Sequence, residues 1–247
     1  MFGERFYRQG MGRGRFEPLT IKEGQSDLWI GLPPASDIQA IEAAARARLA
    51  MLRAEISDYA SARPDFYSSL EPLPEDARPG GIVAAMLGAS RAAGVGPMAS
   101  VAGAVAGALG EFLSAEFALA ELVIENGGDD YLRIASPITV SIYAGLSGLS
   151  GKIGVEATPD LSPLGICTSS ARVGPSLSFG NADACLVACA DCALADAYAT
   201  AYGNRVRRAA DIEPCLEEAG KNPDIVSLVI VRGGTCGAIG RLRLEPL

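Results

Sequence analysis

The chain has 247 residues, of which 49% are hydrophobic and 20% charged, and its formal net charge is -8. This composition can form a sizeable core, and the negative charge argues against nucleic acid or an anionic membrane as a partner. The chain contains no histidine, which removes the usual zinc ligand, the commonest general base and any Ser-His or Cys-His dyad. Catalysis would have to rest on carboxylates, Lys, Tyr, Ser, Thr, Cys or a metal bound by oxygen.

The N-terminal residues and the cysteines indicate the compartment. Segment 1–16 is positively charged but has no apolar stretch, which argues against a secretory signal. The longest run of small apolar residues, Met98 to Leu109, is too short to cross about 30 Å of hydrocarbon. Three of the six cysteines, Cys185, Cys189 and Cys192, lie in one eight-residue stretch of a predicted helix. Cysteines spaced along one helix are poorly placed to form disulfides with each other. We expect a soluble cytoplasmic protein with reduced thiols and no membrane insertion.

The chain opens with a predicted β-hairpin over 16–21 and 27–30. Ser36 or Asp37 can then cap a long helix that runs to about Tyr59 and buries one apolar stripe. The stripe comprises Ile38, Ile41, Ala45, Leu49, Leu52 and Ile56.

A proline-rich segment over 62–79 is expected to be a loop, with a linker as the alternative. Helices of small residues follow over 81–93 and 98–115. Gly103 and Gly107 lie four residues apart in the second helix, a spacing that would suggest a dimerisation face in a membrane. In this chain it favours close packing of the helix in a soluble core.

The second half alternates short strands with two helices. Strands are expected over 121–125, 131–134, 138–144 and 153–156, from 165 onward, over 225–231, and from 236 to about 244. A short helix is expected over 212–219. Adjacent strands joined by short turns favour antiparallel pairing, so the predicted fold class is α+β, with antiparallel sheets packed against alanine- and glycine-rich helices. We expect a single domain over 1–247, or two intertwined halves of about 1–145 and 146–247.

A Gly-Gly pair follows the strand that ends near 125. In Asn126-Gly127-Gly128-Asp129 the backbone can turn sharply and present N–H groups to an anion, while Asp129 accepts hydrogen bonds from a sugar or a base. An ordinary hairpin turn is the favoured alternative, because Asn-Gly is the strongest two-residue hairpin signal.

The hydroxyl cluster Thr168-Ser169-Ser170 ends the strand that begins at 165, and Arg172 follows. Hydroxyls and backbone N–H groups at a strand end can hold a phosphate, which Arg172 would neutralise. Since no base pairs recognisably with these serines, a serine nucleophile is not expected.

The region after this strand predicts a loop and then an alanine-rich helix. Cys185, Cys189 and Cys192 have the C-x3-C-x2-C spacing of some iron–sulfur sites, but on a continuous helix they share one face and pack as small hydrophobes. Asp183 and Asn181 are placed to cap the helix.

Asp196 is the candidate site residue of this helix, and Asp191 lies off its face. An unpaired carboxylate among alanines would cost several kcal/mol, so Asp196 should be paired, protonated, exposed at a cleft or bound to a cation. Thr200, four residues on, shares its face. A hard cation such as Mg²⁺ suits these oxygen ligands.

Taken in order, these motifs resemble the ApbE-like flavin transferase superfamily. The family has a Gly-Gly-Asp segment after a strand, then a Thr-Ser strand, then a helix with Ala-Asp-Ala-x-(Ala/Ser)-Thr-Ala. The corresponding segments are Asn126–Asp129, Thr168–Ser169 and Ala195–Ala201. The resemblance covers roughly 80–204.

The resemblance implies binding of FAD or FMN with Mg²⁺ and transfer of FMN to a threonine or serine of a partner protein. Asp196 and Thr200 fall where the family's Mg²⁺ ligands lie, and Asn126, Gly127, Gly128 and Asp129, with Thr168 and Ser169, where the flavin nucleotide is held. No catalytic residue is assigned.

The chain departs from the family between Pro175 and Gly180, where family enzymes carry a histidine-containing segment. It also has no lysine within 99–106. These departures place the chain in a separate branch of the superfamily and leave two hypotheses, a nucleotide-binding transferase and a non-catalytic binding or assembly protein with the same fold. The small-residue helices are compatible with a homodimer.

Overall fold

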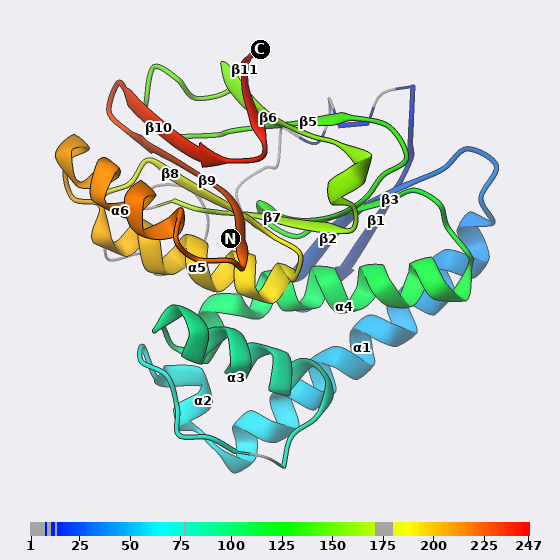
Figure 1. Ribbon diagram of the computed structural model, residues 1–247. Coiled ribbons are helices and arrows are strands. Elements are labelled where there is room, and N and C mark those ends of the chain that lie inside the picture. The colour runs from blue at the N-terminus through cyan, green and yellow to red at the C-terminus, as the bar shows by residue number, and fades with distance from the viewer. Residues whose placement is uncertain (1–7, 9–10, 13, 77, 171–179) are drawn as a thin grey trace.

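The computed structural model describes residues 8, 11–12, 14–76, 78–170 and 180–247. Their elements form three layers, with helices on one face of a large sheet and a small sheet on the other (Figure 1). All paired strands are antiparallel. The predicted α+β class is confirmed.

The large sheet has eight strands in the order β1-β2-β3-β4-β7-β8-β9-β10. They are β1 (Glu17–Glu23), β2 (Ser26–Leu32), β3 (Leu122–Glu125), β4 (Asp129–Arg133), β7 (Leu164–Ser169), β8 (Ala184–Cys189), β9 (Ile225–Arg232) and β10 (Thr235–Gly240). The predicted opening hairpin is confirmed as β1 and β2. The strands from the first half of the chain meet those from the second half where β4 pairs with β7.

The small sheet has the order β11-β6-β5. Its strands are β5 (Ile138–Ser141), β6 (Ile153–Ala157) and β11 (Arg243–Pro246). The single strand predicted from 236 to 244 is therefore wrong, because two strands of different sheets occupy this segment. Gly240 separates them with a φ of +112°, where an added Cβ would meet the Val226 carbonyl oxygen, so only glycine fits the break.

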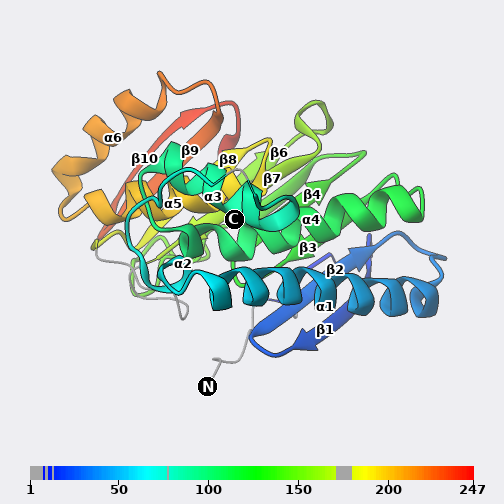
Figure 2. The same ribbon diagram turned by 90° about the horizontal axis from the view of Figure 1, so that it is seen from below.

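The helices cover the other face of the large sheet, as Figure 2 shows from below. They are α1 (Ile38–Ala62), α2 (Asp65–Ser68), α3 (Gly81–Ala93), η2 (Pro97–Ser100), α4 (Val101–Glu116), α5 (Cys192–Arg205) and α6 (Ile212–Ala219), with short 3-10 turns η3 (Pro159–Leu161) and η4 (Ala209–Asp211). Asp37 caps α1 by accepting from the Ala40 N–H at 3.1 Å. The predicted stripe of α1 is buried from Ile41 to Ile56, and Ile38 is half-buried.

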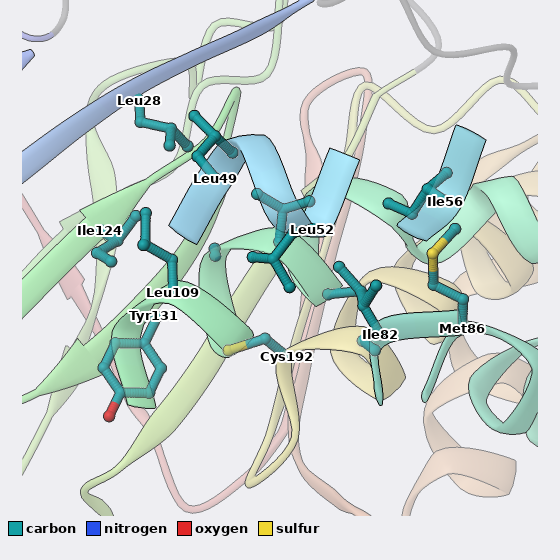
Figure 3. Close-up of a cluster of buried hydrophobic side chains, with 14 of the residues drawn as sticks. Leu28, Leu49, Leu52, Ile56, Ile82, Met86, Leu109, Ile124, Tyr131 and Cys192 are labelled. Atoms are coloured by element: carbon teal, nitrogen blue, oxygen red, sulfur yellow. The ribbon is translucent and has the colours of Figure 1, made fainter. Parts of the chain in front are cut away.

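The described residues form three cores, two under the helices and one between the two sheets. Leu28, Leu49, Leu109 and Ile124 belong to the core between the helices and the first strands (Figure 3). A second core lies between the two sheets, and a third lies under α5 and α6. Successive side chains of a strand point to opposite faces of the sheet, so neighbouring residues such as Leu186 and Val187 enter different cores.

Segment Pro97–Glu116 is the one helix in the described part of the chain that is long and apolar enough to cross a membrane. It extends one residue beyond the predicted bounds of 98–115 at each end, and η2 and α4 follow each other in it without a gap. Half of its most apolar window is buried, and Leu109 and Leu113 belong to the core. Gly103 and Gly107 face Cys192 of α5, which confirms close helix packing as the reason for their spacing.

Candidate functional site

The Asn126–Gly128 segment is the turn of the β3–β4 hairpin. Gly127 and Gly128 have φ of +78° and +101°, the left-handed region that glycine tolerates. Their N–H groups donate to Glu125 Oε1 at 2.6 and 3.0 Å. The hairpin interpretation is confirmed, and Glu125 occupies the two N–H groups that could have faced an anion.

The turn is fixed against two other elements. The Asn126 side chain donates to the Ala102 carbonyl oxygen at 3.0 Å, which ties the turn to the first residues of α4. The Thr168 N–H donates to the Gly128 carbonyl oxygen at 3.0 Å, and Asp129 is paired with Cys167 across β4 and β7. The structure thus brings the Gly-Gly turn, the start of α4 and the Thr-Ser strand together.

Asp196 lies on α5 and faces the start of α4. Its Oδ2 accepts from the Gly103 N–H at 2.9 Å, and the residue is 8% exposed. Amide groups in the first turn of a helix lack partners within that helix, so this carboxylate caps α4 from a neighbouring helix. The structure shows Asp196 buried, with a hydrogen bond to a backbone amide.

Asp129 and Asp196 form a pair of buried carboxyl groups. Burial raises the pKa of Asp129 well above its ordinary value, and the charge of Asp196 raises it further. Burial also raises the pKa of Asp196 to about 7, against the opposing hydrogen bonds from Gly103 and Ala102. Two such groups repel each other when both are ionised, and a proton or a bound cation relieves the repulsion.

The hydroxyl residues take different positions around this pair. Ser169 is buried and lies opposite Gly203 in the second half of α5, while Thr168 and Thr200 are half-buried. The Ser170 hydroxyl donates to the Asp183 carbonyl oxygen at 2.7 Å. Arg172 and most of the 175–180 segment lie outside the described residues. Of the predicted phosphate site, the structure therefore describes only the strand residues Thr168, Ser169 and Ser170.

The carboxyl pair and its surroundings fit a hard cation. The donors are carboxylate oxygens, with the Thr200 hydroxyl on the same helical face as Asp196, and such oxygens are the preferred ligands of Mg²⁺. Within the described ranges, no three His, Cys, Asp or Glu side chains gather in a group that could hold a metal ion. A cation at this pair would therefore take its other ligands from hydroxyl or carbonyl oxygens, or from a bound nucleotide.

Two residues near the pair were not predicted from the sequence. The Cys167 thiol donates to the Cys192 carbonyl oxygen at 3.5 Å and interacts with Asp129. Glu125 receives Arg8 as well as the turn amides. The glutamate directly before Asn-Gly-Gly was a usable signal, because a carboxylate there can reach the amides of a following turn.

The predicted helix around the cysteines begins later than expected. Residues 184–189 form the central strand β8, so Cys185 and Cys189 lie on a strand and only Cys192 on the helix. All six cysteines are free, and these three are buried, which confirms their role in packing. Burial raises the pKa of the Cys185 thiol.

The helix caps differ from the prediction for the same reason. Asp191 caps α5, accepting from the N–H groups of Ala193 and Leu194 at 2.7 and 3.1 Å. Asp183 precedes β8 instead, where its Oδ2 accepts from the Gly233 N–H. Asp191 thus fixes the start of α5.

Similar structures share this layered fold. The apo flavinyl transferase ApbE of Pseudomonas stutzeri superimposes with a TM-score of 0.57 at 15% identity, over 91% of this chain and 94% of that one. The ApbE protein of Thermotoga maritima gives 0.56 at 10% identity, over 90% and 96%. The chain therefore has the ApbE fold.

Closer relatives are found by sequence. The UPF0280 protein of Methanocella arvoryzae is 42% identical over 77% of both chains. That of Methanosphaerula palustris is 45% identical over 77% of this chain and 75% of the relative. The family described as AbpE bacteria matches residues 8–229. The chain belongs to this family, an ApbE-like branch that includes the UPF0280 proteins.

Proposed function

We propose that this protein binds a flavin nucleotide, FAD or FMN, together with Mg²⁺ at the Asp129–Asp196 pair. The juxtaposition of these two buried carboxyl groups beside the Gly-Gly turn is the observation that carries the proposal. The ApbE fold supports it, because solved structures with this fold include flavin transferases.

Mg²⁺ would neutralise and polarise the pyrophosphate of bound FAD. The chain's own residues have distinct parts in this arrangement. Asp196 offers one oxygen to the cation while its other oxygen stays on the α4 amide. Asp129 supplies the second carboxylate, and Thr200 supplies a hydroxyl.

Titration with FAD and FMN, with and without Mg²⁺, tests the binding proposal by calorimetry or flavin fluorescence. We expect binding that depends on Mg²⁺ and is lost in Asp196→Asn. Asp58→Asn is the matched control, since Asp58 is exposed on α1. Absence of flavin binding under every condition, with folded protein, contradicts the proposal.

Transfer of FMN to a protein acceptor is a further step that the same site could perform. The acceptor hydroxyl would lose its proton and attack the FMN phosphorus of FAD, and AMP would leave as the pyrophosphate bond breaks. A covalent flavin band on a threonine-containing acceptor protein, seen by in-gel fluorescence, would establish this activity.

A non-catalytic flavin-binding protein is the second candidate function. The lack of histidine and the engagement of both turn amides by Glu125 favour it. Flavin binding without any transfer or AMP release would select it. For either function we propose a cytoplasmic protein, consistent with six free cysteines.

A further inference from the structure

A cavity of about 710 Å³ lies among the helices, away from the Thr-Ser strand. Its floor is one face of α4, and its walls come from α1, the start of α3, the start of α5 and β4. Ile82, Tyr131 and Cys192, three of its lining residues, are labelled in Figure 3. A cavity of this size can hold a small molecule.

Arg48 of α1 contributes the unpaired charge of this cavity. Its guanidinium lies over the Phe112 ring, 5.4 Å from the centroid, and its Nε is buried with no hydrogen-bond partner. Other arginines of the described chain either pair with an acceptor or, like Arg91 and Arg207, are exposed. A buried N–H without an acceptor is unfavourable, so this position is suited to a ligand that supplies one.

The carboxylates that line the cavity are engaged by other donors. Glu111 receives the Tyr131 hydroxyl at 2.9 Å, and Asp191 receives two amides of α5. At the start of α3, the Glu55 carboxylate lies against Gly81 and offsets the helix dipole there. The guanidinium of Arg48 is therefore the group with which an anion would pair.

We propose that this cavity binds a small-molecule anion whose phosphate or carboxylate group is held by Arg48. A guanidinium presents several donors in one plane and matches either group in a bidentate manner. Stacking on Phe112 orients the guanidinium before the ligand arrives. The rest of the ligand lies against the small residues of α4 that line the cavity, Ala104 and Ala108. The proposal does not rest on flavin binding at Asp196.

Calorimetric titration with inorganic pyrophosphate and with succinate tests the proposal on the full chain. We expect saturable binding of at least one of them, weakened at least about tenfold in Arg48→Gln. Arg46→Gln is the matched control, since Arg46 is exposed on the same helix and pairs with Glu42 at 2.7 Å. Its affinity should stay close to that of the unchanged protein.

Two further variants test whether the cavity itself holds the anion. Ala108→Met fills the cavity without changing charge and should also weaken binding, while Ala50→Met, on the exposed side of α1, should leave it unchanged. Circular dichroism establishes that each variant is folded. The proposal is overturned if neither anion binds, or if Arg48→Gln binds as tightly as the unchanged protein.

Discussion

Gly103 shows how one missing side chain sets the distance between two helices. A Cβ at this position would lie 2.3 Å from the Cys192 carbonyl oxygen and 2.8 Å from Asp196 Cβ. Neither group can move without shifting the start of α5. The glycine thus permits the short contact through which Asp196 caps α4.

Gly103→Ala should lower the free energy of unfolding by about 1–3 kcal/mol through overpacking. Gly88→Ala is the matched control, because it lies in α3 with no atom within 4 Å of an added Cβ. Alanine there should stabilise the helix by about 0.5–1 kcal/mol. Urea unfolding followed by circular dichroism measures both changes, and equal effects would contradict the packing argument.

The buried carboxyl pair predicts a pH dependence of stability. The pKa of Asp196 rises from 3.8 to about 7 on folding, so the folded protein holds a proton that the unfolded chain releases. The stabilising effect of this bound proton is full below about pH 4 and is lost as the pH rises to about 7.

Without metal, the titration of Asp196 should therefore lower the free energy of unfolding by about 1.4 kcal/mol per pH unit between about pH 4 and about pH 7. Denaturant unfolding at a series of pH values, with a chelator present, measures the slope. Asp196→Asn should reduce the slope without removing it, because Asp129, whose pKa is also raised by burial, still contributes; an unchanged slope in that variant would assign the effect to other groups.

At the scale of elements, the boundary between β8 and α5 depends on Asp191. Its carboxylate satisfies two of the amides that the first turn of α5 leaves without partners. Asp191→Ala should cost about 1 kcal/mol of stability, measured by thermal unfolding. Asp58→Ala, on the exposed side of α1, should change stability little.

The sequence predicts some elements well because one physical signal dominates them. The apolar stripe identifies α1, and the choice between Ser36 and Asp37 as its cap leaves the start of the helix open by only one residue. Residues 184–189 are ambiguous, since an apolar run buried on both faces of a central strand resembles a buried helix. Only the tertiary position of β8, between β7 and β9, resolves it.

The candidate site was predictable only in parts. Asp129 and Asp196 were selected from their neighbours along the chain, but the sequence contains no measure of the distance between them. The contact from Asp196 to Gly103 spans 93 positions. Capping by a distant helix leaves no local pattern, unlike a cap within four residues.

At the scale of the whole molecule, the two halves of the chain share one sheet and one inter-sheet core. Strands β4 and β7 pair across the junction, and Trp29 and Val229 belong to the same core. We propose that the halves fold only together.

Fragments 1–145 and 146–247 expressed separately should lack cooperative thermal unfolding, because each exposes a central strand edge and half of a core. Circular dichroism of each fragment, and of the two mixed, provides the measurement. Independent cooperative unfolding of either fragment would show that it is a domain by itself.

Three glycines surround Cys192, with Gly103 and Gly107 on α4 and Gly165 on β7. An added Cβ at Gly165 would lie 2.6 Å from the Cys192 Cα, and one at Gly107 would lie 3.2 Å from its Cβ. A larger residue at any of these three glycines would therefore press against the start of α5. A lineage that acquires a larger residue at 192 would first have to move α4 or β7 outward, whereas exchange for alanine or serine would cost little.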